Sequence, residues 1–149
     1  MKLFNLPFLN WLFLMILAGL LLPSDSWQTI DIYSLPVIIG GIVILISLIW
    51  IFACVGYFIY FNTSPDPRKN TANLITTGPF KFSRNPMYLA FLLISLAIAA
   101  ISCSAYFIIA GGLFFILTHY YTVPKEEKML ARCFSQQWSD YIQQTRRWL

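Results

Sequence analysis

Long runs of apolar residues dominate the sequence, and short polar segments separate them. The runs extend over residues 6–22, 35–61 and 86–121. The first is interrupted only by Asn10, and the second carries no charged residue. At 1.5 Å per residue, helices of the first two lengths would rise by roughly 25 to 40 Å, comparable to the hydrocarbon core of a bilayer. The pattern therefore predicts an all-α membrane protein.

The third run is too long for one straight crossing and is interrupted by the polar sequence Ser102-Cys103-Ser104. A hairpin of two helices fits such a pattern best. We therefore expect a single domain of 149 residues with about four transmembrane helices, the last two forming the hairpin. The predicted spans are residues 6–22, 35–61, 87–101 and 105–121.

Two polar segments complete the chain. Residues 62–86 contain several prolines and the turn sequence Gly78-Pro79, which predicts a loop, either ordered or disordered. Residues 123–149 interleave charged side chains with Met, Leu and aromatic residues. That spacing favours an amphipathic helix at the membrane surface.

Composition and charge support a membrane protein. Charged residues make up 11% of the chain, well below the roughly 25% of soluble domains. The net charge of +4 does not indicate nucleic-acid binding, because the basic residues adjoin apolar runs. With four spans, all ten basic residues fall on one side, while the two external loops hold only Asp25 and Asp31. The positive-inside rule then places both termini in the cytoplasm, and we expect a bacterial-type inner membrane.

The first apolar run and the three cysteines each allow a further expectation. The first apolar run could be a cleavable signal peptide, but no clear small-residue cleavage site precedes Pro23, so we favour a retained anchor. Cys54, Cys103 and Cys133 are widely spaced, which argues against a disulfide framework and a zinc site and favours small packing residues.

The first candidate cluster for chemistry runs from Thr76 to Tyr88. Within it, Asn85 could cap the next helix through its side chain, and Pro86 suits the first helical position. Arg84 would then stand at a helix N-terminus, which is a ready site for a carboxylate or phosphate. An arginine at a helix end can also serve membrane topology alone.

The second candidate cluster is the acidic pair Glu126 and Glu127. The pair adjoins the end of the fourth predicted span, where an unpaired carboxylate costs free energy, so each should have a cationic or hydrogen-bonding partner. A pair that only caps a surface helix is the alternative. The single histidine, His119, has no evident partner, and we interpret it as a helix residue rather than a ligand.

Together these clusters resemble the superfamily of isoprenylcysteine carboxyl methyltransferases and phospholipid N-methyltransferases. The sequence reads T-T-G-P-F-K-F-S-R-N-P-M-Y over residues 76–88, then E-E-K-M-L over residues 126–130 and F-S-Q-Q-W-S-D-Y over residues 134–141, with a basic end. The resemblance extends from about Leu74 to Trp148, half of the chain. Both motifs occur in the family's order and at hairpin spacing.

The resemblance implies a helical bundle with a cytoplasm-facing pocket for S-adenosyl-L-methionine that opens toward the bilayer for a lipid or small hydrophobic acceptor. No metal is expected. Arg84, as the anchor for the cofactor carboxylate, and Glu127 are the residues expected to serve catalysis. The residues expected to bind the cofactor are Leu74, Ile75, Phe80, Asn85, Tyr88 and Glu126.

The sequence departs from the family pattern at three positions. Asn85 stands where many relatives have histidine, and Asn cannot carry a proton at neutral pH. Ser135 stands where the F-G pair has glycine, and Thr122 stands where the carboxyl methyltransferases have arginine. The last departure argues against a prenylcysteine carboxylate as acceptor, and amine, carboxylate and thiol acceptors stay open, as does the oligomeric state.

Two other functional hypotheses remain. One is a sterol-reductase-like enzyme that uses NADPH, for which the chain is short. The other is a non-catalytic membrane subunit that keeps the fold as an assembly surface, and the departures at Asn85 and Ser135 favour it.

Overall fold

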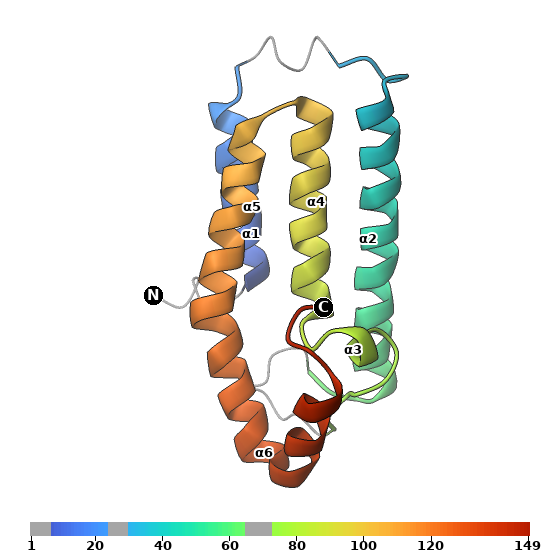
Figure 1. Cartoon of the computed structure of the whole chain (residues 1–149), viewed down its shortest axis with the longest axis vertical. Helices are drawn as coiled ribbons and strands as arrows, with labels where there is room; N and C mark the ends of the chain where they lie inside the picture. Colours follow the sequence, from blue (N-terminus) through green and yellow to red (C-terminus); the bar gives the residue numbers. More distant parts are fainter. Residues whose placement is uncertain (1–6, 24–29, 65–72) are drawn as a thin grey trace.

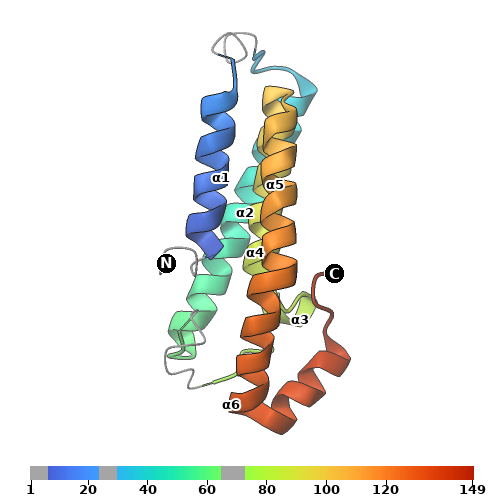
Figure 2. The same cartoon turned by 90° about the vertical axis from the view of Figure 1, so that its left-hand side faces the viewer.

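The central helix of the structure is α4 (Pro86–Ser102), which lies between α2 (Leu35–Tyr60) and α5 (Ala105–Leu117) (Figure 1). The fourth long apolar helix, α1 (Pro7–Leu21), packs on α5. Figure 2 shows α1 beside α5, with α2 and α4 behind them. This computed structural model describes residues 7–23, 30–64 and 73–149. The described residues form helices and no strand, which confirms the predicted all-α class.

The polar sequence between α4 and α5 forms a tight turn. Cys103 adopts a left-handed conformation with φ of 46° and ends α4. Ser104 begins α5, and its Oγ accepts a hydrogen bond from the backbone N–H of Tyr106 at 3.3 Å. A side chain that accepts from the first turn stabilises a helix N-terminus. The break predicted at residues 102–104 is therefore the turn between two antiparallel helices (Figure 1).

The predicted fourth span, which ends at Tyr121, and the predicted amphipathic segment from Val123 lie on one continuous helix. α5 continues through a π-helical turn, η3 (Thr118–Thr122), into α6 (Val123–Gln144). Pro124 lacks an N–H group, and its ring would collide with the carbonyl four residues earlier in a regular α-helix. The wider π turn just before it accommodates this proline without ending the helix.

Within the described residues, two helices are long and apolar enough to cross a membrane. They are α2 and the continuous helix of 40 residues from Ala105 to Gln144. α1 and α4 are shorter apolar helices. Large apolar side chains on α2, such as Ile42, Leu45 and Ile49, are exposed, as expected of a lipid-facing surface. That all four helices span a bilayer stays a prediction.

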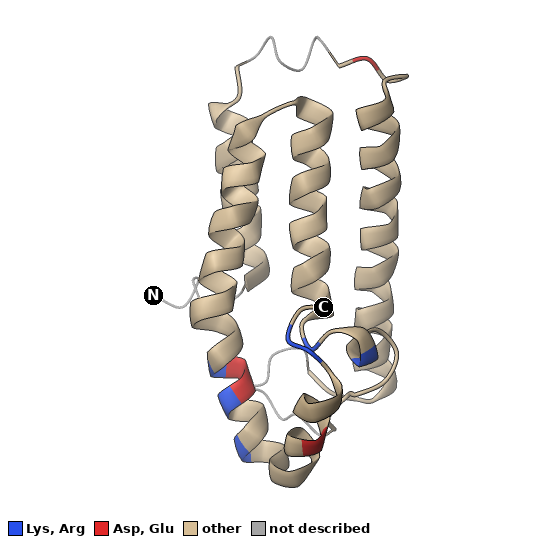
Figure 3. Ribbon diagram, viewed as in Figure 1, with Lys and Arg blue, Asp and Glu red and all other residues tan. Residues whose placement is uncertain are grey.

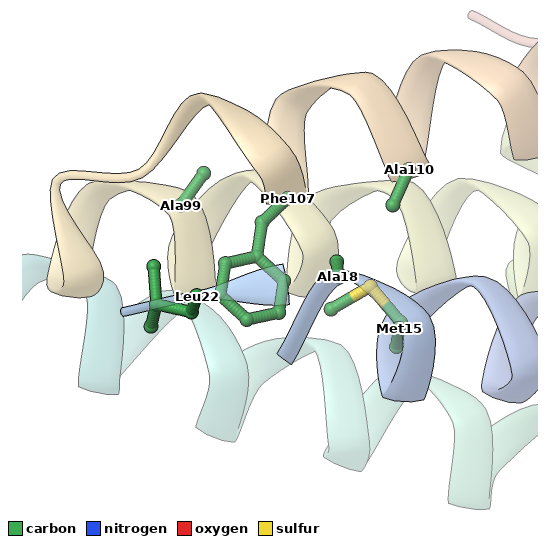
Figure 4. Packing of buried hydrophobic residues seen from close by; sticks show 6 residues of the cluster. All are labelled: Met15, Ala18, Leu22, Ala99, Phe107 and Ala110. Atoms are coloured by element: carbon green, nitrogen blue, oxygen red, sulfur yellow. The ribbon is translucent and has the colours of Figure 1, made fainter. Parts of the chain in front are cut away.

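Small residues allow the helices to pack closely. A core cluster joins α1 to α4 and α5 (Figure 4), and its members are Met15, Ala18, Leu22, Ala99, Phe107 and Ala110. Gly111 faces the Cβ of Ser95, and a Cβ added there would lie 2.9 Å from it. Beside this contact, Trp11 donates from Nε1 to Ser95 Oγ at 2.9 Å and to the Phe91 carbonyl at 3.1 Å. These contacts hold α1 and α5 against α4.

Only one of the three cysteines packs inside the protein. Cys54 is fully buried in a cluster with Ile75 and Phe80, whereas Cys103 and Cys133 are exposed. The expectation that all three are packing residues is therefore wrong for the latter two, because each lies at a bend or on an outer face of its helix. Cys54 instead anchors the segment that precedes α3 (Pro79–Phe82).

Charged residues gather at one end of the bundle, where α3, α6 and the C-terminal tail lie (Figure 3). The segment before α2 is at the opposite end (Figure 3), and Asp31 belongs to it, since its carbonyl accepts a hydrogen bond from the N–H of Ser34 at the start of α2. Lys2, Asp25, Arg68 and Lys69 fall outside the described residues. The described charges therefore follow the asymmetry that the sequence predicted.

Within the predicted loop 62–86, Gly78 precedes the single turn of α3 with φ of 62°. A Cβ at Gly78 would overlap the ring of Tyr57. Both the dihedral angle and this contact require glycine. The turn that leads to Arg84 is therefore fixed by Gly78 against α2.

We expect Gly78→Ala to lower the free energy of unfolding by at least about 2 kcal/mol, because the positive φ and the overlap with Tyr57 both oppose a side chain. Thermal unfolding of the detergent-purified protein measures the change. Gly41→Ala is the matched control, since a Cβ added at Gly41 would meet no atom within 4 Å. Equal stability of the Gly78→Ala variant and the parent would contradict this account.

Another special backbone position is Ser135, which interrupts α6 with φ of 32° and ψ of −97°. After this kink the chain turns back toward α3 and α4 (Figure 1). Glycine adopts positive φ at little cost, whereas for other residues this conformation costs about 1–2 kcal/mol. The positive φ at this kink therefore explains why glycine suits this position in the family's F-G pair.

We expect Ser135→Gly to raise the free energy of unfolding by about 1 kcal/mol, because glycine relieves the strained backbone. Ser139→Gly, in the regular helix that follows, should instead lower it by a few tenths of a kcal/mol to about 1 kcal/mol. Thermal unfolding of the two variants under identical conditions tests the opposite signs. A loss of stability in both would refute the assigned strain.

Candidate functional site

A cavity of about 810 Å³ lies at the charged end of the bundle. Its walls come from α1, α2, the segments before and after α3, α4, and the continuous helix from α5 to α6. All eight residues that the sequence singled out line it: Leu74, Ile75, Phe80, Arg84, Asn85, Tyr88, Glu126 and Glu127. The fold therefore brings together two clusters that are about forty positions apart in the sequence, and the roles of these residues stay predictions.

Glu127 is enclosed by two arginines. Arg84 Nη1 lies 3.0 Å from Glu127 Oε1. Arg147 donates from Nε to the same oxygen at 3.1 Å and from Nη2 to Oε2. The second contact is bidentate, the geometry in which a guanidinium binds a carboxylate most strongly. The three side chains together carry a net positive charge.

Glu126 faces α4. Its Oε1 accepts a hydrogen bond of 2.7 Å from the Tyr88 hydroxyl. Tyr88 also makes an edge-to-face contact with Phe114 of α5. The expected partners of both glutamates are therefore present, since Glu127 binds cations and Glu126 binds a hydroxyl.

The C-terminal tail supplies backbone acceptors to the segment between α3 and α4. The Arg147 carbonyl accepts from Asn85 Nδ2 at 3.0 Å and from Ser83 Oγ at 3.3 Å. The Arg146 carbonyl accepts from the backbone N–H of Arg84 at 3.0 Å. Asn85 precedes α4, but its side chain accepts no hydrogen bond from the first turn of that helix, so the expected side-chain cap is absent. Pro86 does occupy the first turn, as predicted.

Aromatic side chains from α6 cover the same region. The guanidinium of Arg84 lies 5.7 Å from the ring centroid of Trp138, which is within cation–π range. Tyr141 donates from its hydroxyl to the Phe80 carbonyl at 2.6 Å. Burial raises the pKa of Tyr141 above its usual range, although the nearby charge of Arg84 lowers it in part. Tyr141 therefore stays protonated and keeps this hydrogen bond.

His119 has a partner, contrary to the sequence-based expectation. Trp148 donates from Nε1 to His119 Nδ1 at 3.0 Å, and the two rings stack at 6.1 Å between centroids. Phe115 packs against both rings. Because Nδ1 is the acceptor, the imidazole that makes this bond is unprotonated at that nitrogen. These rings fix the end of the tail on the continuous helix.

The sequence analysis missed several residues of the site. Arg147, Trp138 and Tyr141 belong to the basic end and the aromatic motif that the resemblance quoted, but no pattern assigned them a contact. Pro7, Phe8 and Asn10 of α1 also line the cavity. They lie outside both motifs, and an apolar run gives no signal that one of its ends meets a site.

Some cavity residues are also exposed on the outside of the bundle and so mark its mouth. They include Phe8 of α1, Leu117 of α5, Tyr121 of η3 and Lys125 of α6. The last three follow one another at intervals of four residues along one side of the continuous helix. Along this side, the apolar Leu117 is followed by the aromatic Tyr121 and then by the cationic Lys125.

The chemistry available in the cavity is that of binding and orientation. The site offers guanidinium and carboxylate groups, a phenol, an amide and aromatic faces. Among residues 7–23, 30–64 and 73–149, no group of three or more His, Cys, Asp or Glu side chains could hold a metal ion. Such a donor set suits a zwitterionic organic ligand with a carboxylate and a cationic centre.

Comparison with known proteins identifies the family of this chain. No curated protein and no solved structure matches the chain. The family model described as phospholipid methyltransferase matches residues 29–137. This match covers well over half of the chain and includes both candidate clusters. The chain therefore belongs to the phospholipid methyltransferase family.

Proposed function

We propose that the protein transfers a methyl group from S-adenosyl-L-methionine to a lipid-like or small hydrophobic acceptor at the cytoplasmic face of a membrane. The observation that carries the proposal is the convergence of both motif clusters on one cavity in a member of this family. A volume of about 810 Å³ lies in the upper part of the range for ligand pockets, roughly 300–1,000 Å³. Such a volume leaves room for an acceptor beside the cofactor.

The polar side of the cavity fits the cofactor. Arg84 has a buried Nε without a hydrogen-bond partner in the described structure, so it can bind the cofactor carboxylate. Glu126 is suited to the amino or ribose groups, and Asn85 retains a carbonyl oxygen as an acceptor. The faces of Phe80 and Tyr88 can stabilise a cation. Leu74 and Ile75 supply an apolar wall.

Catalysis on this site would rest on positioning. The cofactor, when bound, supplies a sulfonium methyl group for in-line displacement. The residues need only hold the two reactants in the right geometry and exclude water, which can contribute several kcal/mol to lowering a barrier. Glu127 would act through its charge on the two arginines rather than by transferring a proton, because both of its oxygens bind guanidinium groups.

The mouth of the cavity supports a lipid-like acceptor. Phe8 and Leu117 present apolar surface there, and Tyr121 is an aromatic residue of the kind enriched at membrane interfaces. An acceptor with an apolar tail could therefore enter from the bilayer with its tail against Phe8 and its reactive end toward Tyr88.

A four-span topology is consistent with this site. We infer that α1, α2, α4 and α5 cross a bacterial-type inner membrane, with α6 at its surface. Lys81, Lys125, Lys128 and Arg132 lie at the charged end, at least partly exposed. The positive-inside rule would place this end, with the cavity and both termini, on the cytoplasmic side.

We expect Glu126→Ala to weaken binding of S-adenosyl-L-methionine at least tenfold, because about 1.4 kcal/mol or more is lost with a charged hydrogen-bonding group. Isothermal calorimetry with the detergent-purified protein measures the affinity. Asp140→Ala removes an exposed carboxylate of α6 outside the cavity lining and is the control. Unchanged affinity in Glu126→Ala would overturn its role, and no binding by a folded parent would favour a non-catalytic subunit.

We expect Tyr121→Ala to raise the KM for the acceptor several-fold while the affinity for S-adenosyl-L-methionine is unchanged, because Tyr121 stands at the mouth. Radioactive methyl transfer to an extracted membrane lipid fraction measures this parameter. Tyr120→Ala is the matched control, since Tyr120 is similarly exposed but does not line the cavity. Equal effects of the two substitutions would refute the assigned entry route.

A further inference from the structure

The carboxylate of Glu127 lies between two cations that compete for it. Arg147 takes both oxygens, whereas Arg84 contacts only Oε1 through Nη1. The side chains of Arg84 and Glu127 are 14% and 15% exposed, so both are largely removed from water. In such surroundings a charged pair interacts more strongly than it would at the surface. The charge that Arg84 presents to a ligand therefore depends on which arginine Glu127 neutralises.

Arg84 keeps donors for another ligand. Its Nε is buried and has no hydrogen-bond partner in the described part of the chain. Without Arg147, Glu127 could turn both oxygens to Arg84 and form the bidentate pair that Arg147 now occupies. The charge of Arg84 would then be compensated within the protein, and its affinity for an anion would fall.

We propose that Arg147 is a positioning residue that occupies Glu127 and so leaves Arg84 available for the carboxylate of the cofactor. This inference rests on the function proposed above. It assigns a task to the C-terminal tail, which lies beyond residues 29–137 that match the family model. Arg147 acts through Glu127 and Arg84 and is not itself placed against the reacting atoms.

The tail is held firmly enough for this task. Residues on both sides of the Arg147 side chain are fixed, because Trp148 binds His119 and the Arg146 carbonyl accepts from Arg84. The Arg147 carbonyl itself binds Asn85 and Ser83. A guanidinium on such a backbone loses little freedom when it binds a carboxylate, which favours the pair.

The test compares two ligands that differ only in the carboxylate, namely S-adenosyl-L-methionine and its decarboxylated form. Calorimetry on the detergent-purified full chain gives both affinities for each protein. The variants are Arg147→Gln, the double variant Arg147→Gln with Glu127→Gln, and Arg146→Gln as the matched control. The control removes a neighbouring charge that is not part of the cavity lining and keeps the backbone carbonyl.

We expect Arg147→Gln to weaken S-adenosyl-L-methionine binding about tenfold, the size expected for a charge-assisted hydrogen bond. Its affinity for the decarboxylated ligand should change by less than about twofold, within the usual limit of additivity. In the double variant, the neutral amide that replaces the Glu127 carboxylate no longer neutralises Arg84, so the preference for the carboxylate ligand should return. Arg146→Gln should resemble the parent with both ligands.

Equal weakening of both ligands by Arg147→Gln would show a merely structural role and overturn the proposal, as would no weakening or a double variant that does not recover. If Arg147→Gln does not fold, Arg147→Lys replaces it, because lysine keeps the charge but not the bidentate geometry. It should then lose part of the preference for the carboxylate, and full retention would count against the proposal. A folded parent that does not bind S-adenosyl-L-methionine would instead overturn the proposed function, and this inference with it.

Discussion

A charged side chain beside the end of an apolar helix costs free energy unless another group satisfies it. In this protein the constraint is met by groups that are distant in the sequence. Glu127 of α6 binds Arg84 from the turn before α4 and Arg147 from the tail. The tail also accepts a hydrogen bond from the backbone N–H of Arg84, so these contacts join three segments at the end of the bundle. The shape of the cavity depends on these contacts between α6, the turn before α4 and the tail.

The family match and the cavity do not have the same extent. The match covers residues 29–137, whereas α1 and the end of the chain, which lie outside it, contribute Phe8, Asn10 and Tyr141 to the lining. The matched part holds the two motifs that point to methyl transfer. The flanking parts contribute Phe8 to the mouth of the cavity and Arg147 to the charged cluster.

The sequence predicted the features that depend on local composition. Apolar runs indicated the helices, and Ser102-Cys103-Ser104 indicated the turn between α4 and α5, because a polar break in an apolar run leaves few other structures. The motifs indicated eight residues that meet in one cavity. The continuity of the helix past Tyr121 was not predicted, since a π turn accommodates Pro124 and no local pattern distinguishes such a turn from a helix end.

Pairings between distant segments could not be predicted in the same way. Asn85 is of a residue type that often caps helices, but its side chain donates from Nδ2 to the tail and does not cap α4. The hydrogen-bond partner of His119 is Trp148, which is 29 residues later in the sequence. Arg147 was visible only as part of a basic end. Each of these contacts depends on the kink at Ser135, which directs the tail back to the bundle.

The π turn at Thr118–Thr122 determines which way the side chains after it point. An α-helix advances about 100° per residue, so a π turn is equivalent to one inserted residue that rotates everything after it by about that angle. Deleting one residue from this turn would leave α5 in place and rotate Glu126 and Glu127 away from the cavity by more than a quarter of a revolution. The orientation of the acidic pair therefore depends on the number of residues in this turn.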